Sequence, residues 1–144
     1  MGIDTVIFDM DGVILDTEQV WDAVRHDFAE AHGGRWTGED QRAVMGANSL
    51  QWAAYMREHC GVDLPDAEIH AGVVQALRES YARDLPLLPG ARETIAGIAG
   101  LYRLGLASSS PRALIEYSLE LAGLRRFFAA VVSSDEVARG KPEP

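Results

Sequence analysis

Apolar and polar positions along the chain predict three short strands separated by helices. Residues 5–8, 104–107 and 128–132 are apolar runs, and the first, Thr-Val-Ile-Phe, is typical of a strand buried on both faces. Apolar residues at helical spacing predict one helix from about residue 91 and another that ends at Gly123. Strands that alternate with helices imply right-handed crossovers and a parallel sheet. The pattern therefore predicts an α/β fold.

Residues 17–86 show helical spacing throughout, with glycines where several of the helices stop. The expected helices are one around Trp21 to Ala31, a short one around Glu39 to Met45, one capped by Asn48 or Ser49, and a long one from near Pro65. Together they make a small bundle. We therefore expect a discontinuous α/β core of residues 1–16 and 87–144, with a helical bundle of residues 17–86 inserted into it.

The composition is that of an acidic globular protein. The 144 residues are 47% hydrophobic and carry a formal net charge of -9, which disfavours nucleic acid and anionic membrane as partners. No apolar run approaches the length of a membrane span, and the first strand begins too early to leave room for a signal segment. The one cysteine, Cys60, permits no internal disulfide and suits a reducing compartment. We therefore expect a cytoplasmic location.

Two aspartates follow the first strand, one residue apart. Asp9 and Asp11 come at its carboxyl end, where Asp11-Gly12 breaks the apolar run, and ligands of open α/β sheets bind at this edge. Crowded carboxylates destabilise a fold unless a cation or a shared proton relieves their repulsion. Hard cations such as Mg²⁺ favour such an oxygen-rich setting. The simpler alternative, a solvated acidic turn, suits a bare Asp-x-Asp better than one followed by Gly-Val-Ile-Leu-Asp-Thr-Glu.

The stretch from Val6 to Glu18, which reads VIFDMDGVILDTE, resembles the opening motif of the haloacid dehalogenase superfamily. It is most similar to the branch of sugar-phosphate phosphatases and β-phosphoglucomutase-like enzymes, whereas the dehalogenases lack an acid in the place of Asp11. The resemblance implies a Rossmann-like parallel sheet with an inserted helical cap. It also implies that Asp9 is a nucleophile toward phosphorus and that Asp11 is a general acid and base. Mg²⁺ would be held by Asp9 and by the main-chain carbonyl of Asp11.

Three serines end the second strand in Gly-Leu-Ala-Ser-Ser-Ser-Pro. Ser108 stands where the superfamily carries a phosphate-binding Ser or Thr, and the amides that open the following helix favour an anion. We therefore expect Ser108 to bind the phosphate, while Ser109 could bind it or only turn the chain. Ser110 precedes Pro111, which predicts that Ser110 is the N-cap of the helix.

Lys141 lies in Gly-Lys-Pro-Glu-Pro, which resembles the third motif of the same superfamily. An ammonium there would offset the repulsion between Asp9 and a phosphate, and would hold the transferred group. A lone lysine in a loop is usually solvated, but glycine and proline restrict this one. Lys141 is therefore a catalytic candidate beside Asp9, Asp11 and Ser108.

Residues 46–49, Gly-Ala-Asn-Ser, resemble the cap loop that this branch turns toward the substrate. Gly46 and Asn48 are therefore candidate substrate-binding residues, together with Gly12 and Ser109. β-Phosphoglucomutases carry basic residues around this loop, where this chain has Met and Ser; two nearby arginines keep the mutase interpretation open. The three tryptophans are expected to pack inside the protein, and the four histidines, which lack metal-ligand spacing, to lie on helix surfaces.

The main interpretation is a Mg²⁺-dependent phosphatase that acts on a small phosphorylated metabolite, such as a sugar phosphate, through an aspartyl-phosphate on Asp9. The alternatives are a β-phosphoglucomutase-like phosphotransferase and a phosphate-binding module without turnover. Response-regulator receivers also combine an aspartate, Mg²⁺ and a lysine, but they lack a long helical insertion after the first strand. The sequence leaves the oligomeric state open.

The chain ends at Pro144, shortly after the lysine motif. Members of the superfamily that it resembles continue through a helix and further strands, which carry the remaining metal ligands and pair beside the first strand. Asp135 and Glu136 precede the lysine and do not match that later acidic motif. We therefore expect an incomplete core in which the first strand has an open apolar edge.

Overall fold

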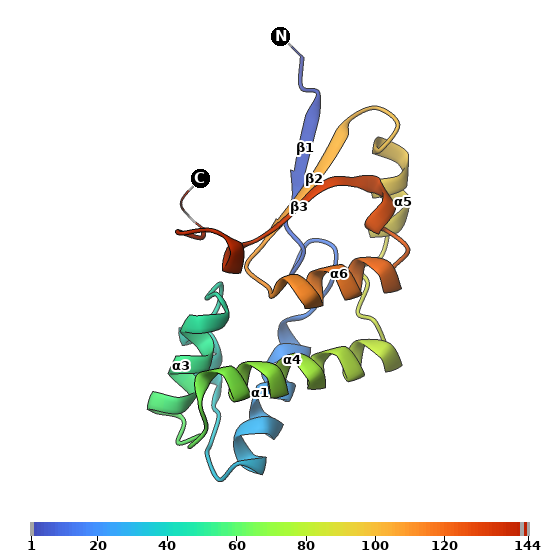
Figure 1. The fold of residues 1–144 in the computed structure, drawn as a ribbon. Helices are drawn as coiled ribbons and strands as arrows, with labels where there is room; N and C mark the ends of the chain where they lie inside the picture. The colour runs from blue at the N-terminus through green and yellow to red at the C-terminus, as the bar shows by residue number, and fades with distance from the viewer. Residues whose placement is uncertain (1, 142, 144) are drawn as a thin grey trace.

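In the computed structural model, which describes residues 2–141 and Glu143, three parallel strands form one sheet. β1 (Thr5–Phe8) pairs with β2 (Arg103–Ser108), and β2 pairs with β3 (Phe128–Ser133), as Figure 1 shows. Because parallel strands run in one direction, their carboxyl ends meet at the same edge. The α/β fold with a parallel sheet that the sequence predicts is confirmed.

Two helices cover one face of this sheet. α5 (Ala91–Ile98) leads into β2, and α6 (Arg112–Leu121) leads away from it, with a 3-10 turn, η1 (Arg125–Phe127), before β3. Burial alternates along β2, so that every second side chain points toward these helices. The apolar core between sheet and helices contains these buried side chains: Ile95, Leu104, Leu106, Ile115, Leu119, Leu124, Phe128 and Val131.

β1 is less buried than its apolar sequence suggested. Its side chains alternate between exposed and half-buried, and Ile7 is 70% exposed. Ile7 pairs with Gly105, on the face of the sheet opposite the buried Leu104 and Leu106. The expectation of a strand buried on both faces is therefore wrong, because α5 and α6 cover only the other face. β1 does form an open edge of the sheet, as expected.

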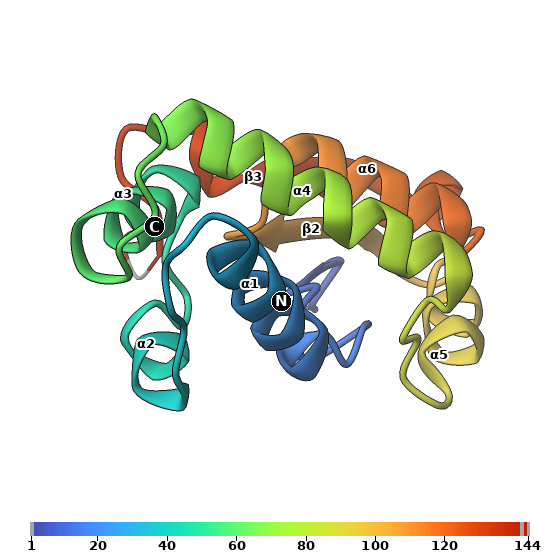
Figure 2. The same cartoon turned by 90° about the horizontal axis from the view of Figure 1, so that it is seen from below.

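Four helices lie between β1 and α5 along the chain, and we call them the helical insertion. They are α1 (Glu18–Ala31), α2 (Gly38–Ala43), α3 (Ser49–His59) and α4 (Asp66–Arg83). Figure 2 shows α4 alongside α6, which it contacts. The insertion has a core of its own, and the three tryptophans pack there as predicted. Its buried side chains include Trp21, Trp36, Trp52, Met56, Ile69, Val73, Leu77 and Tyr81. No helix in the described part of the chain is long and apolar enough to cross a membrane.

Side-chain caps set where two of these helices begin. Before α2, the Thr37 amide donates to Asp40 at 2.8 Å, and the Thr37 side chain accepts from the Asp40 amide. Before α3, Asn48 and Gln51 exchange the same two bonds at 3.0 and 3.1 Å. Such a capping box satisfies amides that the helix itself leaves free. Of the two residues expected to cap α3, Asn48 is therefore the cap.

The buried apolar side chains form two clusters. One joins side chains of the helical insertion, and the other joins the strands with α5 and α6. Leu114 of α6 belongs to the cluster of the insertion, so the two parts pack against each other through α6. The domain boundaries near residues 16 and 87 remain a prediction.

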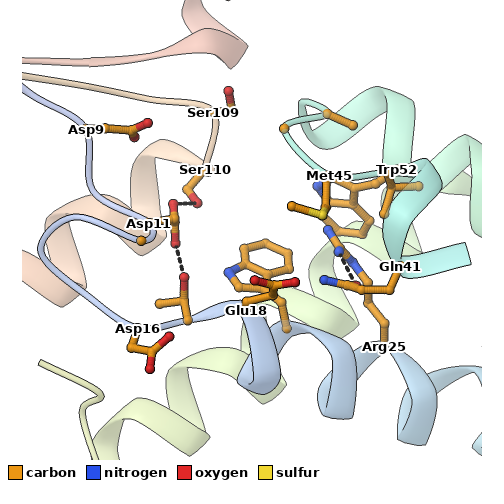
Figure 3. A pocket seen from close by; sticks show the side chains of 16 residues that line it. Asp9, Asp11, Asp16, Glu18, Arg25, Gln41, Met45, Trp52, Ser109 and Ser110 are labelled. Carbon is orange, nitrogen blue, oxygen red and sulfur yellow. Dashed lines mark hydrogen bonds between the residues drawn. The ribbon is translucent and has the colours of Figure 1, made fainter. Parts of the chain in front are cut away.

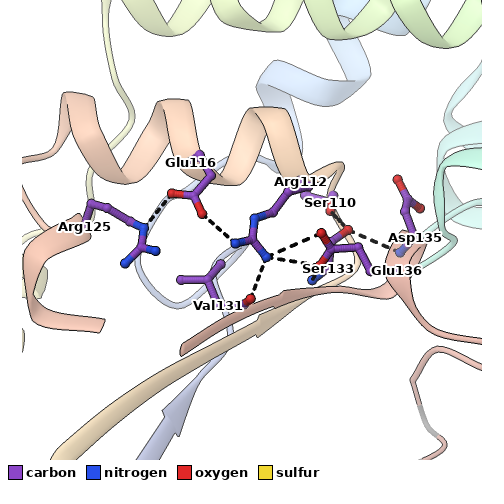
Figure 4. A network of polar contacts seen from close by, with 8 residues as sticks. All are labelled: Ser110, Arg112, Glu116, Arg125, Val131, Ser133, Asp135 and Glu136. Carbon is purple, nitrogen blue, oxygen red and sulfur yellow. Dashed lines mark hydrogen bonds and ion pairs between the residues drawn. The ribbon is translucent and has the colours of Figure 1, made fainter. Parts of the chain in front are cut away.

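Ion pairs attach the turn after β3 to α6 (Figure 4). This 3-10 turn is η2 (Ser134–Glu136), and its Glu136 carboxylate lies 3.1 Å from a guanidinium nitrogen of Arg112. Glu116, one helical turn after Arg112, pairs with Arg112 at 2.9 Å and with Arg125 at 2.5 Å. The pairs are partly exposed, so each stabilises the fold only modestly. Together they hold η2 beside the start of α6.

Asp135 of η2 makes a polar contact with the helical insertion. Its carboxylate accepts from the Ser49 amide at 3.1 Å and from the Ser49 hydroxyl at 2.5 Å. Ser49 is the first residue of α3, so the carboxylate lies at the positive end of that helix. The contact therefore positions the start of α3, and the loop before it, relative to the carboxyl edge of the sheet.

Gly72 and Gly97 offer a matched test of the packing. A Cβ at Gly72 in α4 would collide with a ring carbon of Phe28 in α1, whereas a Cβ at Gly97 in α5 meets nothing within 4 Å. We expect Gly72→Ala to lower the free energy of unfolding by about 1–3 kcal/mol, the usual cost of overpacking. Gly97→Ala should raise it by about 0.5–1 kcal/mol, because alanine favours the helical state. Urea denaturation measures both, and an unchanged Gly72→Ala protein would contradict the α1–α4 packing.

The contact between Ser49 and Asp135 predicts slow hydrogen exchange at the Ser49 amide. Asp135→Ala removes the acceptor, so this amide should exchange about tenfold faster, which corresponds to the loss of one hydrogen bond to a charged group. Exchange measured by NMR checks this. The Thr37 amide, which is bonded to Asp40, is the internal control and should keep its rate. A Ser49 rate that is equal in both proteins would show that Asp135 does not hold α3.

Candidate active site

Asp9 follows β1 directly and lies at the carboxyl edge of the sheet. One of its carboxylate oxygens accepts from the Met10 amide at 2.7 Å, and the other lies 3.0 Å from Nζ of Lys141. The same Nζ donates to the carbonyl oxygen of Ala107, near the end of β2, at 2.8 Å. The carboxylate is 44% exposed, so it can be reached from solvent while its charge is partly neutralised. The predicted pairing of Asp9 with Lys141 is therefore present, although Pro142 and Pro144 of the lysine motif lie outside the described residues.

Asp11 is held by hydroxyl groups. Thr17 donates to one carboxylate oxygen at 2.7 Å, and Ser110 and Ser108 donate to the other at 2.7 and 3.3 Å. Gly12, with φ of +79°, lies in the turn after Asp11, in a conformation that only glycine adopts at little cost. This turn brings the chain back so that Thr17 lies beside Asp11. The two carboxylates thus have separate sets of partners, which limits their mutual repulsion.

Ser110 does not cap α6, which corrects the expectation from the sequence. The extended residue before α6 is Pro111, and no side chain caps this helix. The Ser110 hydroxyl bonds instead to Asp11, because a carboxylate is a stronger acceptor than a neutral group. Ser108 is 2% exposed and also accepts from the Ser110 amide at 3.1 Å, whereas Ser109 faces the open space beside Asp9.

A cleft of about 310 Å³ separates these groups from the helical insertion. Figure 3 shows Asp9, Asp11, Ser109 and Ser110 on the side of the sheet. The opposite side is formed by the insertion, with these side chains among those that line it: Arg25, Gln41, Met45 and Trp52. We call this space the active-site cleft. The two aspartates after the first strand, the serines after the second strand and the expected cap loop all contribute residues to this cleft.

The expected cap loop contributes only in part. Gly46, with φ of +74°, lines the active-site cleft together with Met45 and Ala47. Asn48 does not line it, because its side chain accepts from the Gln51 amide and begins α3. The substrate-binding role expected of Asn48 therefore has no support from its position, while Gly12, Ser109 and Gly46 lie where the sequence predicts.

Sequence reasoning missed the buried basic group on the insertion side, Arg25. This residue is 5% exposed, lines the cleft and donates to the Gln41 side chain at 3.1 Å. Burial lowers the pKa of Arg25 to about 10, with Asp22 and Asp11 opposing the shift. A signal was present, since Trp21 and Arg25 stand four residues apart and so share one face of α1. Nothing in the sequence alone said that this face meets the cleft.

Few oxygen groups at this site could bind Mg²⁺. Mg²⁺ is commonly held by one or two carboxylates, waters and a substrate phosphate, and Asp9 with the main-chain carbonyl of Asp11 meets that requirement. Within residues 2–141 and Glu143 there is no group of three or more His, Cys, Asp or Glu side chains that could hold a metal by itself. Asp9 and Asp11 therefore remain the candidate ligands among the described residues, and their role as ligands stays a prediction.

Two curated relatives carry the names of phosphatases. The chain is 28% identical over 143 residues to the phosphorylated carbohydrates phosphatase of Thermotoga maritima, covering 99% of this chain and 66% of that protein. It is 32% identical over 150 residues to hexitol phosphatase B of Escherichia coli, covering 96% of this chain and 64% of that protein. The chain thus spans about two thirds of the length of these relatives.

Solved structures share the fold, and a family model matches the chain. A crystal structure of CbbY from Rhodobacter sphaeroides in complex with xylulose-(1,5)bisphosphate is similar with a TM-score of 0.83 at 25% identity, covering 98% of this chain and 68% of that one. A β-phosphoglucomutase from Clostridium difficile has a TM-score of 0.81 at 17% identity, covering 99% and 67%. The family model matches residues 3–144, nearly the whole chain. The protein therefore belongs to the haloacid dehalogenase-like hydrolase family.

Proposed function

We propose that the protein is a Mg²⁺-dependent phosphomonoesterase that hydrolyses small phosphorylated metabolites, such as sugar phosphates, through an aspartyl-phosphate on Asp9. One observation carries this proposal: a solvent-accessible Asp9 carboxylate lies 3.0 Å from Lys141, and a hydroxyl-bonded Asp11 lies beside it at the edge of one cleft. The names of the curated relatives support the substrate class.

Asp9 is the nucleophile in this proposal. Its carboxylate oxygen attacks phosphorus, the bond from phosphorus to the ester oxygen breaks, and the leaving alkoxide takes a proton. Water then attacks phosphorus of the aspartyl-phosphate, which releases phosphate and restores the carboxylate. The Lys141 ammonium, fixed by the carbonyl oxygen of Ala107, offsets the negative charge that the phosphate brings beside Asp9.

Asp11 moves the protons of both half-reactions in this proposal. In its protonated form it donates to the leaving oxygen, and as the carboxylate it later accepts a proton from water. Thr17 and Ser110 bond to opposite oxygens of this carboxylate, so they fix its plane. Mg²⁺, held by Asp9 and the Asp11 carbonyl oxygen, would neutralise charge on the phosphoryl oxygens.

We also propose that the helical insertion, residues 17–86, serves as the cap of this active site. Its side of the cleft carries aromatic and apolar side chains, the basic Arg25 and the acidic Glu18, whereas the side of the sheet carries the reacting carboxylates. The contact of Ser49 with Asp135 holds the two sides together. A cap of this kind would exclude water and select the leaving alcohol.

A cytoplasmic location is part of the proposal. Burial raises the pKa of the Cys60 thiol to about 11, so this single cysteine stays protonated and unreactive at neutral pH. A buried, reduced thiol is compatible with a reducing compartment. The partner that we propose is a small phosphorylated substrate.

A β-phosphoglucomutase-like phosphotransferase is the second candidate, and Arg25 is the observation that favours it. A mutase must grip a second phosphate, and Arg25 is a buried cation in the cleft. Of the arginines near the cap loop, Arg57 pairs with Asp66 at 2.6 Å, and the exposed Arg42 does not line the cleft. The relative CbbY was crystallised with a bisphosphate. Interconversion of glucose 1- and 6-phosphates with little free phosphate would select the mutase.

Asp9→Asn should abolish phosphate release from an aryl phosphate, because it removes the nucleophile with little change of shape. The wild-type protein should release phosphate only with Mg²⁺, and EDTA should reverse that activity. Asp4→Asn is the matched control, since Asp4 precedes the same strand at its other end. A phosphate-release assay, with circular dichroism to verify folding, measures all three proteins. If the Asp9→Asn protein still hydrolyses the ester, then Asp9 is not the nucleophile.

Asp11→Asn should slow hydrolysis by roughly 10²- to 10⁴-fold, the usual contribution of general acid–base catalysis. The loss should be smaller for esters with good leaving groups, because these alkoxides need no proton. Steady-state rates for a nitrophenyl phosphate and an alkyl phosphate, compared in both proteins, provide the measurement. Equal losses for both esters would mean that Asp11 does not protonate the leaving group.

A further inference from the structure

Arg25 is a buried cation enclosed by aromatic rings. The carbon of its guanidinium lies 4.5 Å from the ring centroid of Trp21, 5.2 Å from that of Trp52 and 5.6 Å from that of Trp36. These three are all the tryptophans of the chain. Figure 3 shows the guanidinium beside Gln41 on the insertion side of the active-site cleft, across from Asp11.

This guanidinium has few hydrogen-bond acceptors among the described residues. The bond to Gln41 at 3.1 Å is the hydrogen bond that the described structure gives it, and its buried Nε has no partner there. A guanidinium has five N–H donors in a fixed fork. None of the ion pairs in the described part of the chain includes Arg25. The nearby Asp22 carboxylate accepts from the indole of Trp36 instead, at 2.9 Å.

A purely structural role explains this arrangement poorly. Contacts with aromatic rings stabilise a cation weakly compared with the cost of removing it from water, and buried charges are normally paired. The exposed Arg57 shows ordinary pairing in the same fold, with Asp66 and Glu58 as partners. A buried charged group that lines a cleft and has no ion-pair partner is instead typical of a ligand-binding residue.

The position of Arg25 defines what that ligand would be. Asp9 lies at one side of a cleft of about 310 Å³, and Arg25 lies at the other. A phosphate bound at Asp9 therefore leaves the rest of a small substrate facing the guanidinium. The planar fork matches two oxygens of one anionic group, which it binds with two parallel hydrogen bonds.

We propose that Arg25 recognises a second anionic group, a carboxylate or a phosphate, on the leaving-alcohol part of the substrate. This inference rests on the proposed function, since it assigns the substrate class of the same cleft. Gln41 orients the guanidinium, and the indoles of Trp21 and Trp52 exclude water from the charged contact. The preferred substrates are thus phosphomonoesters with a remote acid group, and neutral sugar monophosphates bind more weakly.

Binding can be measured without turnover, because the three tryptophans surround Arg25 and report on it by fluorescence. Two probe pairs separate the two anions: 3-phosphoglycerate against glycerol 3-phosphate for the carboxylate, and fructose 1,6-bisphosphate against fructose 6-phosphate for the second phosphate. In at least one pair, the compound with the second anionic group should bind about tenfold or more tightly than the compound without it, as expected for hydrogen bonds between charged groups. The pair that shows the preference identifies the anion.

Gln41→Glu is the decisive variant, because it gives Arg25 an internal counter-ion in place of the amide now 3.1 Å away. It should remove the preference for the probe with a second anionic group. It should also raise the melting temperature, so that loss of folding does not explain the result. Ala43→Glu adds the same charge at an exposed position of α2 and should keep the preference. Arg25→Lys keeps the charge without the fork, and should reduce the preference without removing it.

Equal binding of both members of both pairs, including no measurable binding by any probe, would overturn the inference. A preference that survives Gln41→Glu, or one that Ala43→Glu also removes, would overturn it as well. Phosphate release is recorded separately for the same four probes. If the preference is present and no probe is hydrolysed, then the proposed function fails and the assignment of Arg25 as the anion-recognising residue stands.

Discussion

The structure depends on keeping two neighbouring carboxylates apart at the end of one strand. Asp9 and Asp11 would repel each other if both faced the same partners. The fold prevents this, because Asp11 accepts from the hydroxyls of Thr17 and Ser110 whereas Asp9 lies beside Lys141. Each carboxylate therefore has its own partners, which stabilise its negative charge. These partners differ, and so does the chemistry that they favour: a cation beside Asp9 suits attack on a phosphate, and neutral hydroxyls around Asp11 suit proton transfer.

The parallel sheet makes this arrangement possible from segments far apart in sequence. Asp11 meets Ser108, and Asp9 meets Lys141, because β1 and β2 end at one edge and the turn after β3 brings the chain back to it. The helical insertion then needs only to face that edge. Contact through Leu114 of α6 and through Asp135 of η2 fixes how it does so. The reacting groups thus belong to the rigid part of the fold, and the groups that face the rest of a substrate belong to the inserted part.

Much of this could be predicted from local pattern, and the failures have physical causes. The three strands and the positions of Asp9, Asp11 and Lys141 follow from apolar runs and short motifs. Ser110 was misassigned because Ser-Pro before a helix is a good local cap signal, whereas its actual acceptor, Asp11, is 99 residues away in sequence. Burial of the first strand was overestimated because a sequence does not say whether one or both faces of a sheet are covered.

Arg25 illustrates a different limit and the reason it matters. Spacing places it on one face of α1 with Trp21, but spacing cannot show that the face lies opposite the carboxylates across a cleft. Only the fold shows that the charge is buried and unpaired, because pairing is a property of neighbours in space. The sheet side of the cleft therefore carries the carboxylates with Lys141, where phosphorus would react, and the insertion side carries the guanidinium of Arg25, with the Glu18 carboxylate, where the leaving alcohol would lie. A substrate with one phosphate and one further acid group satisfies both sides at once, and this complementarity gives the incoming molecule a single orientation.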